Sequence, residues 1–293
     1  MKLDSVKLDP AKFEHDLCTC LGHVRLRPGA SLPHLAAIAP TWLSSSASKI
    51  LSSADVHLWL VNVETCAESL PLFEQILSPD EHARAAKFRQ ASDRTRFITC
   101  RGILRHLLSR YTGLSPAAIR FFYGPYGKPV FAQPSGETPP LQFNLSHAGG
   151  LALYAFTLTN PIGVDLEQHR PLDVPALART FFSERERAVL EQVPPAEQLA
   201  QFFQLWTCKE AYLKAIGLGL SGLEQAELAI APNGSVCLAT FTNASSPHSH
   251  WRVQPMSLGN HVSAAFAVNL QTFNLCCYPI RHVQDLVYLL ESV

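Results

Sequence analysis

The feature that most constrains the fold is a helical pattern that occurs twice in the chain. It begins with a capping box, in which a serine starts a helix and a glutamate three residues later bonds back to the serine N–H. The two boxes are Ser78-x-x-Glu81 and Ser183-x-x-Glu186. A longer helical stretch follows each box, over Arg94–Tyr111 and Gln198–Ile216. Each stretch stops at a glycine, Gly113 or Gly217, which suits the left-handed backbone at a helix end.

Strands are expected beside these helices. Val56–Val63, VHLWLVNV, shows the apolar alternation of a strand, and the segments LYAFTL and SAAFAV place Ala-Phe pairs at 155–156 and 265–266. We therefore predict an α+β fold of two similar, pseudo-symmetric halves, each with helices packed on an antiparallel sheet. The cleft between two such units is a common place for a ligand, so the active site is expected there.

The predicted domain boundaries follow from these elements. Residues 1–52, which prolines interrupt, form an N-terminal extension that lies over the core or is partly mobile. Residues 53–158 form the first α+β half, and residues 159–293 form the second. The second half ends in a short C-terminal helix over Arg281–Ser292.

The composition argues against several classes of protein. The 293 residues are 47% hydrophobic, enough for a sizeable core, and the formal net charge of zero does not suit a protein that coats nucleic acid. The start lacks the apolar core of a secretory signal, and no apolar run approaches the roughly 20 residues of a membrane helix. The eight cysteines contain no C-x-x-C pair, which disfavours zinc. We expect a cytoplasmic protein with reduced cysteines and without nucleic-acid or membrane partners.

An alternation of apolar and acidic residues follows Gly163 in IGVDLE. Side chains two positions apart lie on one face of a strand, so Asp165 and Glu167 would stand side by side, and their like charges require neutralisation. Mg²⁺ prefers one or two carboxylates and completes its shell with water and phosphate oxygens. An isolated D-x-E would equally suit a solvated strand edge.

The second long helix contains the segment WTCKEAYLK. Glu210 and Lys214 are four residues apart and therefore share one helix face. The pair fits a surface salt bridge beside a core tryptophan. It also fits a chemical site, in which Glu210 is a third metal ligand or a general base and Lys214 offsets charge on a transferring phosphoryl group.

Two further groups of residues suit phosphate binding. FNLSHAGG runs from a strand into a glycine-containing turn, where backbone N–H groups, Ser146 and His147 can donate to an anion. His147 alone would equally suit a structural histidine. The second group is the cations of the first half, one or two of which could grip a phosphate while the others line solvated helix faces. These cations are Arg84, Arg94, Arg96, Arg101, Arg105 and Lys128.

Taken in order, YGKP, FNLSH, IGVDLE, FFSERE and WTCKEAYLKAIGLGL closely resemble the phosphopantetheinyl transferases of the surfactin-synthetase-activating (Sfp) type. The resemblance covers about residues 77–221, and its specific part is GVD combined with W-x-x-KEA-x-x-K. It implies transfer of the phosphopantetheine arm of coenzyme A, the co-substrate, to a serine hydroxyl of an acyl or peptidyl carrier protein. It also implies release of 3',5'-ADP and dependence on Mg²⁺, with Mn²⁺ as a substitute. The residues before 52 have no counterpart in it.

The resemblance also implies roles for single residues. Asp165, Glu167 and Glu210 would hold the metal, Lys214 would contact the pyrophosphate, and Glu210 would take the serine proton, directly or through a water. The residues implied in coenzyme A binding are Arg84, Arg96, Lys128, Ser146, His147 and Lys209.

Three further positions carry less specific expectations. Glu186 matches an acidic position of the family but also completes a capping box, so a catalytic and a structural role both stay open. Glu81 stands where some relatives carry lysine, which weakens any inference about nucleotide contacts there. His169–Phe182 carries basic residues among apolar ones; it suits contact with the carrier protein or a plain connecting segment.

Two other functions stay open on the residues alone. A Mg²⁺-dependent nucleotide hydrolase could use the same acidic cluster, although the chain has no P-loop G-x-x-x-x-G-K-[ST]. The other alternative is a non-catalytic module that only docks carrier domains. The absence of the acidic residue or a lysine from KEA-x-x-K would favour this module. Because two halves in one chain would complete one site, we expect a monomer.

Overall fold

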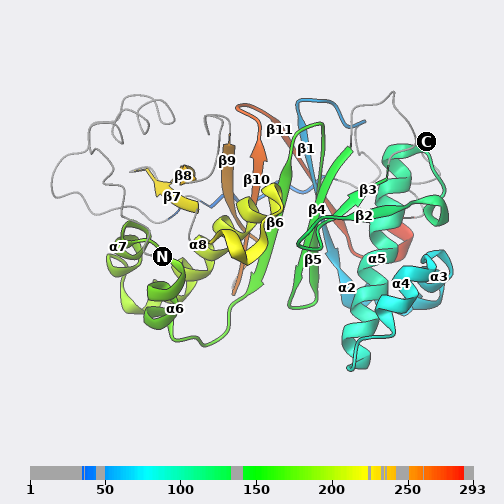
Figure 1. The fold of residues 1–293 in the computed structure, drawn as a ribbon, viewed down its shortest axis with the longest axis horizontal. Helices are drawn as coiled ribbons and strands as arrows, with labels where there is room; N and C mark the ends of the chain where they lie inside the picture. Colours follow the sequence, from blue (N-terminus) through cyan, green and yellow to red (C-terminus); the bar gives the residue numbers. More distant parts are fainter. Residues whose placement is uncertain are drawn as a thin grey trace.

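The structure is a computed structural model (Figure 1). It describes residues 35, 37–43, 50–132, 141–223, 226–231, 234, 236–241, 251–259 and 261–286. Much of the predicted extension over 1–52 and the end of the predicted helix over 281–292 lie outside these residues. Within the described parts of the chain, no helix combines the length and the apolar character needed to cross a bilayer.

The first half is a sheet covered on one face by helices (Figure 1). Its strands pair in the order β11-β1-β5-β4. They are β1 (Asp55–Asn62), β4 (Leu141–Ala148), β5 (Leu151–Leu158) and β11 (Asn274–Ile280). Its helices are α2 (Val63–Cys66), η2 (Ala67–Ser69), α3 (Leu70–Ile76), α4 (Pro79–Ala85), α5 (Ala91–Thr112) and η3 (Pro116–Ala118). A hairpin follows α5, formed by β2 (Phe121–Tyr123) and β3 (Pro129–Phe131).

The second half repeats this design, with α8 lying along its sheet (Figure 1). The strands pair in the order β6-β10-β9-β8-β7. They are β6 (Ile162–Gln168), β7 (Ala226–Ile230), β8 (Val236–Phe241), β9 (Trp251–Ser257) and β10 (Val262–Asn269). The helices are α6 (Val174–Phe181), α7 (Glu184–Glu191), α8 (Pro195–Ile216) and η4 (Gly219–Gly222). The predicted α+β fold is confirmed.

Buried apolar clusters explain how the halves combine. One cluster lies between each sheet and its helices, and another lies between the two sheets. Neighbouring residues of one strand alternate between clusters: Trp59 of β1 packs under α5, whereas Leu58 packs between the sheets. The halves therefore share a core, and the helices cover the outer faces.

Both predicted capping boxes form. The N–H of Ser78 donates to Glu81 at 2.9 Å, and the N–H of Ser183 donates to Glu186 at 2.8 Å. The long helices α5 and α8 then end at glycines with φ angles of 70° and 76°, in the left-handed region that glycine tolerates.

The path of the last residues differs from the predicted boundaries. β11 falls within 159–293, the range expected for the second half, but it pairs with β1 in the first sheet, and in parallel. Val283 and Leu286 after it also pack on the core of the first half. The first half is thus completed by residues distant in sequence, and its sheet is antiparallel except at this pair.

The two Ala-Phe pairs lie in strands as predicted, but they are not equivalent. Phe156 of β5 packs in the cluster under α5, whereas Phe266 of β10 packs between the two sheets. A shift of one residue turns every side chain of a strand to the opposite face. If the two halves were aligned by these identical Ala-Phe pairs, their strands would be out of register by one residue.

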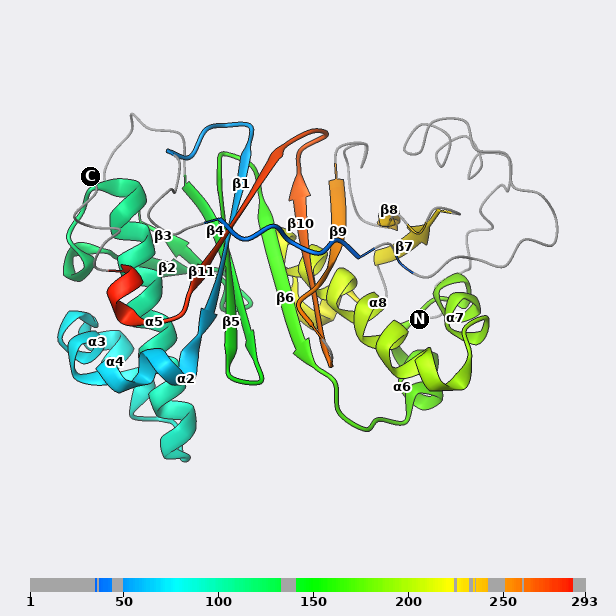
Figure 2. The same ribbon diagram turned by 180° about the vertical axis from the view of Figure 1, so that it is seen from behind.

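Residues 37–43 cross both sheets on the side that faces the viewer in Figure 2. Ile38 forms a parallel bridge with Met256 of β9, and Trp42 forms one with Cys277 of β11. Both apolar side chains pack against the cluster between the sheets. This described part of the predicted extension lies on the core and connects the halves.

Candidate active site

The site begins where the edge strands β4 and β6 of the two sheets approach each other. Asn144 Oδ1 of β4 accepts a hydrogen bond from the N–H of Val164 in β6 at 2.9 Å. Further along β4, Ser146 Oγ donates to Asp165 Oδ1 at 3.0 Å. These contacts join the halves and hold a strand from each at the place where the acidic residues lie.

Gly163 explains how close α8 comes to this junction. A Cβ at Gly163 would lie 2.1 Å from the carbonyl oxygen of Ala211 and 2.4 Å from the nitrogen of Ala215, both in α8. Any larger residue would push the helix away from β6. The close packing brings Glu210 and Lys214 of α8 beside Asp165.

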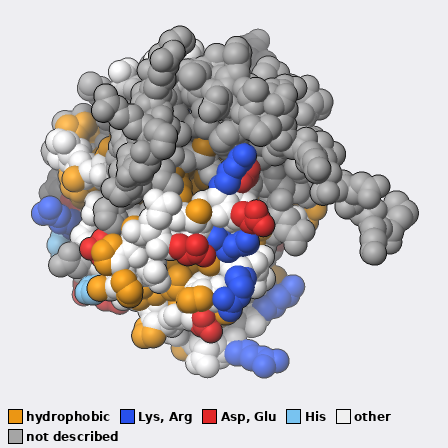
Figure 3. All heavy atoms as spheres, turned by 90° about the vertical axis from the view of Figure 1, so that its left-hand side faces the viewer, with side chains coloured by type: hydrophobic (Ala, Val, Ile, Leu, Met, Phe, Trp, Pro, Cys, Tyr) orange, Lys and Arg blue, Asp and Glu red, His pale blue; other side chains and the backbone are white. Residues whose placement is uncertain are grey.

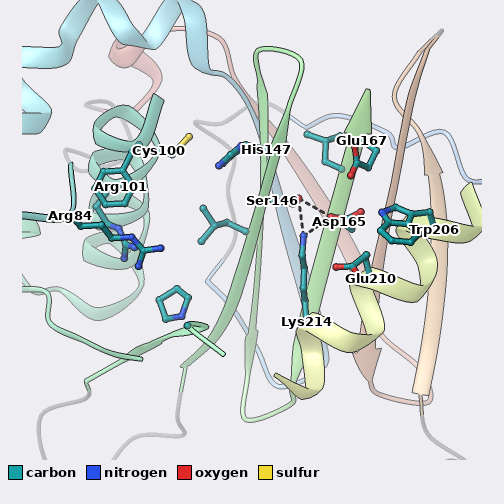
Figure 4. A pocket seen from close by; sticks show the side chains of 15 residues that line it. Arg84, Cys100, Arg101, Ser146, His147, Asp165, Glu167, Trp206, Glu210 and Lys214 are labelled. Atoms are coloured by element: carbon teal, nitrogen blue, oxygen red, sulfur yellow. Dashed lines mark hydrogen bonds and ion pairs between the residues drawn. The ribbon is translucent and has the colours of Figure 1, made fainter. Parts of the chain in front are cut away.

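A cavity of about 530 Å³ opens between the halves (Figure 4). Its second-half wall is formed by Asp165, Glu167, Trp206, Glu210 and Lys214. The opposite wall includes Arg84, Phe97, Cys100 and Arg101, and Ser146 and His147 of β4 lie between the two walls. The predicted cleft is confirmed, and its walls differ in charge: arginines on one side and carboxylates with a lysine on the other.

Asp165 is the most enclosed of the acidic groups, with a side chain 5% exposed. Lys214 Nζ lies 2.5 Å from Asp165 Oδ1 and donates to Ser146 Oγ at 3.1 Å. The ammonium compensates a carboxylate whose burial would otherwise be costly. Among the described residues, Asp165 Oδ2 is buried without a hydrogen-bond partner.

Glu210 carries a strongly perturbed carboxyl group. Its burial raises the pKa to about 7; Lys214 opposes the rise, while Asp165 and Glu167 add to it. The buried Oε1 has no hydrogen-bond partner among the residues that the structure describes. A carboxyl group with a pKa near neutrality can accept and return a proton at physiological pH.

The donor atoms suit a hard divalent cation. Asp165 and Glu210 each present a buried oxygen that lacks a partner in the described chain, and carboxylate oxygens are the ligands that Mg²⁺ takes from proteins. Glu167 pairs with Arg170 at 2.9 Å on the more exposed side. No three His, Cys, Asp or Glu side chains of the described residues are already gathered as a metal-binding group. The oxygens therefore fit the ion, but in this arrangement Lys214 stands beside Asp165.

The residues predicted to bind coenzyme A are divided by the structure. Arg84, Ser146 and His147 line the cavity. Arg96 is exposed, lies outside the lining and pairs with Asp93. Its charge is nevertheless close enough to the cavity residue His147 to help burial lower the pKa of that imidazole, and the place of Arg96 at the ribose phosphate stays a prediction.

Lys128 ties the halves together. Its ammonium donates to the carbonyl oxygen of Ala215 at 2.8 Å and to that of Ile162 at 3.3 Å. Burial lowers its pKa to about 8. Lys128 thus attaches the β2–β3 hairpin to α8 and β6, and its neighbours Gly127 and Pro129 line the cavity.

Lys209 points away from the cavity. Its ammonium lies 2.8 Å from Glu186 Oε2 and donates to the carbonyl oxygen of Phe181 at 3.0 Å, and both charged side chains are almost wholly buried. Glu186 also accepts from the N–H groups of Ser183 and Leu228. The ammonium of Lys209 is used in these bonds, which hold α7 to α8. The predicted contact of Lys209 with coenzyme A is therefore not supported.

The family resemblance assigned coenzyme A binding to Arg96, whereas the sequence offered Arg101 only as one of several cations that could grip a phosphate. The Arg101 side chain lines the cavity and is 8% exposed, and its guanidinium lies 4.7 Å from the Phe121 ring centroid. Its Nη1 has no hydrogen-bond partner among the described residues. The signal that could have found it is helical spacing, because Phe97 and Arg101 are four residues apart and both face the cavity.

Comparison with known proteins decides the family. Residues 64–158 match a family model described as 4'-phosphopantetheinyl transferase, N-terminal, and residues 161–267 match the 4'-phosphopantetheinyl transferase superfamily. The 4'-phosphopantetheinyl transferase HetI of Nostoc sp. is 42% identical over 201 residues, which are 68% of this chain and 84% of HetI. The chain belongs to the 4'-phosphopantetheinyl transferase family. It is a transferase, as the motifs predicted.

Other relatives of this family agree with the motifs. The 4'-phosphopantetheinyl transferase Sfp of Bacillus subtilis is 33% identical over 149 residues, or 51% of this chain and 64% of Sfp. A holo-(acyl-carrier-protein) synthase structure from Bacillus anthracis, in complex with CoA, matches 37% of this chain and 93% of its own at 19% identity. Its TM-score with this chain is 0.30.

Proposed function

We propose that this transferase moves the 4'-phosphopantetheine arm of coenzyme A to a serine hydroxyl of an acyl or peptidyl carrier protein, releases 3',5'-ADP and depends on Mg²⁺. The observation that carries the proposal is the division of charge across the cavity. Arginines line one wall, and Asp165, Glu167 and Glu210 line the other with Lys214 (Figure 4). A polyanion with phosphates at both ends of a nucleotide suits this division.

The cations of the cavity would bind and orient the nucleotide end of coenzyme A. Arg84 and Arg101 belong to the first-half wall, and their guanidinium groups can hold a phosphate through paired hydrogen bonds. Ser146 and Lys214 lie at the junction of the halves, where both can donate to the pyrophosphate. These contacts would fix the β-phosphorus in front of the acidic wall.

Asp165, Glu167 and Glu210 would hold the metal ion. When bound there, Mg²⁺ offsets the negative charge that grows on the phosphate oxygens during transfer. The two buried carboxylate oxygens left without a partner in the described chain, on Asp165 and Glu210, support this assignment. Mn²⁺ takes oxygen ligands of the same kind and is expected to replace it.

Glu210 would accept the proton of the attacking serine. The serine oxygen forms a bond to the β-phosphorus, the bond from that phosphorus to the bridging oxygen breaks, and 3',5'-ADP leaves with the electron pair. The buried Glu210 Oε1, which has no hydrogen-bond partner among the described residues, is available to accept this proton, directly or through a water. Positioning and electrostatic stabilisation would supply most of the acceleration.

The carrier protein needs access to the cavity from outside. The predicted contact region, His169–Phe182, includes α6, on a side where apolar side chains mix with charged ones (Figure 3). A second cavity, of about 440 Å³, lies there between helices and is lined in part by Val174, Ala178 and Arg179. We propose this region as the docking surface for the carrier protein. We also propose that a cytoplasmic monomer suffices, since one chain supplies both walls.

Intact-protein mass spectrometry tests the function. An apo carrier protein incubated with this transferase, coenzyme A and Mg²⁺ is expected to gain the mass of one phosphopantetheine, and EDTA is expected to prevent the gain. Release of 3',5'-ADP without a modified carrier would favour the hydrolase alternative. Carrier binding without modification, across acyl and peptidyl carriers, would favour the docking module.

A further inference from the structure

Lys214 and Ser146 do not extend freely into the cavity. Both bond to the same oxygen, Asp165 Oδ1: Lys214 at 2.5 Å and Ser146 at 3.0 Å. Lys214 also donates to Ser146, so the three groups form a closed triangle. The two residues proposed to contact the pyrophosphate are thus occupied by a residue proposed to hold the metal.

The charges of the acidic wall are only partly balanced. Lys214 balances Asp165, and Arg170 balances Glu167. Glu210 Oε1 and Asp165 Oδ2 lack partners within the described residues. The Lys214 side chain is 28% exposed, whereas that of Asp165 is 5% exposed. The lysine can therefore leave towards solvent, while the carboxylate stays fixed in the wall.

We propose that Lys214 is an internal counter-ion that takes the place of the divalent cation beside Asp165 and leaves when the cation binds. The proposal rests on the proposed function, which supplies the metal and the polyanionic substrate. An ammonium is a compact point charge on a flexible stem, so it can neutralise a carboxylate in one position and a phosphate in another. Lys214 would alternate between Asp165 and the pyrophosphate.

Competition between the two cations has a thermodynamic consequence. An ammonium and a divalent cation at the same carboxylate repel each other, so a cation must displace Lys214 before it binds fully. The apparent cation affinity is then reduced by the fraction of molecules in which Lys214 occupies Asp165. A phosphate that draws Lys214 away raises cation affinity, and by reciprocity the cation raises affinity for the phosphate ligand by the same factor.

The test is Mn²⁺ binding without coenzyme A, measured from the electron paramagnetic resonance signal of the free ion. Lys214→Met is expected to bind Mn²⁺ about tenfold more tightly than the unmodified chain, a factor within the usual range of coupling between sites. Lys214→Arg keeps the charge and is expected to keep the weaker affinity. Lys87→Met, which removes an exposed lysine outside the cavity lining, controls for net charge.

A thermal melt of each variant, with and without Mn²⁺, controls for folding. Without metal, Lys214→Met is expected to have a lower Tm than the unmodified chain. Addition of Mn²⁺ is expected to raise the Tm of this variant by more than it raises the Tm of the unmodified chain. If this variant is unfolded without metal, Lys214→Gln replaces it, because the amide still donates to Asp165. Equal or weaker Mn²⁺ affinity in the folded neutral variant would overturn the proposal.

The experiments distinguish a failure of the counter-ion from a failure of the proposed function. Tighter Mn²⁺ binding in the neutral variant, with no modification of any carrier by the unmodified chain, would uphold the counter-ion and reject the transfer. Normal modification by the unmodified chain, with unchanged Mn²⁺ affinity in the neutral variant, would reject the counter-ion alone.

Discussion

The two halves of the molecule share a framework but differ in what lies between the long helix and the adjacent strand. Measured from the glycines that end α5 and α8, Arg105 and Lys209 occupy the same helical position. Each pairs with the glutamate of its own capping box: Arg105 with Glu81 at 2.7 Å, and Lys209 with Glu186 at 2.8 Å. This shared ion pair holds a short helix against the long one in both halves.

The first half fills the space between α5 and β1 with aromatic groups. Trp59 Nε1 donates to the hydroxyl of Tyr111 at 2.8 Å, and His57 Nδ1 lies 2.9 Å from the same hydroxyl. Trp59 and His57 are wholly buried. The indole of Trp59 and the ring of His57 thus meet at the Tyr111 hydroxyl inside an apolar core.

The second half places different residues at the corresponding positions. The face of β6 that meets α8 carries Gly163 and Asp165, whereas the face of β1 that meets α5 carries His57 and Trp59. Counted back from the glycines that end the two helices, Ala215 of α8 corresponds to Tyr111. The smaller residues bring α8 closer to its strand and leave a carboxylate where the other half has an indole. One half thus fills this space with buried aromatic groups, whereas the other half places charged groups of the site there.

The largest expected effect lies in the feature that the halves share. Lys209→Met leaves buried Glu186 without its counter-ion, and Arg105→Met removes the closer of the two arginines that pair with buried Glu81, the other being Arg101 at 3.5 Å. Each variant is expected to reduce the free energy of unfolding by about 3–5 kcal/mol, with the smaller loss in Arg105→Met. Urea denaturation of both variants measures this. A loss below about 1 kcal/mol in either variant would contradict the equivalence. Unchanged coenzyme A affinity in folded Lys209→Met would also show that Lys209 does not contribute to coenzyme A binding.

The two arginines of α5 test which side chain reaches the substrate. Arg101→Gln is expected to weaken coenzyme A binding by about 1.5–3 kcal/mol, the range for hydrogen bonds to charged groups. Arg96→Gln, the matched exposed variant, is expected to change the affinity by less than about 0.5 kcal/mol. Isothermal titration with coenzyme A measures both. The reverse order of effects would restore the original assignment of Arg96.

Gly163→Ala tests the close approach of α8 in the second half. The added methyl group meets backbone atoms of α8, so we expect a stability loss of about 1–3 kcal/mol from overpacking. Displacement of Glu210 and Lys214 is expected to slow transfer by about 100-fold. Gly124→Ala is the control, because its Cβ would meet a backbone oxygen only at 3.7 Å. Equal transfer rates for the two variants would show that close packing does not position the site.

Tyr111→Phe tests the corresponding place in the first half. Loss of the hydroxyl leaves buried Trp59 without its acceptor, and about 1–2 kcal/mol of stability should be lost. Because the aromatic cluster serves only packing, the transfer rate of the folded variant is expected to stay unchanged. Urea denaturation and carrier modification are compared on one preparation. A fall in rate at temperatures where the variant is fully folded would argue against the division between the halves.

The sequence predicted features that depend on nearby residues. The capping boxes, the glycine helix ends and the strand at Val56–Val63 follow from spacings of a few positions. The same holds for Asp165 and Glu167 on one strand face. Such local signals, joined by the family resemblance, were enough to predict the α+β fold and the cleft.

Features that depend on distant contacts were missed. Nothing local to β11 indicates that it returns to the first sheet, because its partner β1 lies at the other end of the chain. Lys209 and Glu210 are adjacent, yet neighbouring side chains of an α-helix point about 100° apart, which sends the first into the core and the second into the cavity. Arg101 was not singled out from the other cations for a similar reason, since its neighbours in space are the rings of a hairpin that follows α5.

The central claim is that the chemistry belongs to the second half, and one matched pair of variants tests it most directly. Glu210 and His106 occupy the same position relative to the glycines that end α8 and α5, but His106 packs beside Phe73 outside the cavity lining. Single-turnover transfer to an apo carrier, followed by intact mass, compares Glu210→Gln with His106→Gln. We predict a loss of about 10²–10⁴-fold for Glu210→Gln, the usual contribution of a general base, and a rate near that of the unmodified chain for folded His106→Gln. A Glu210→Gln rate within a few-fold of the unmodified chain would contradict the account.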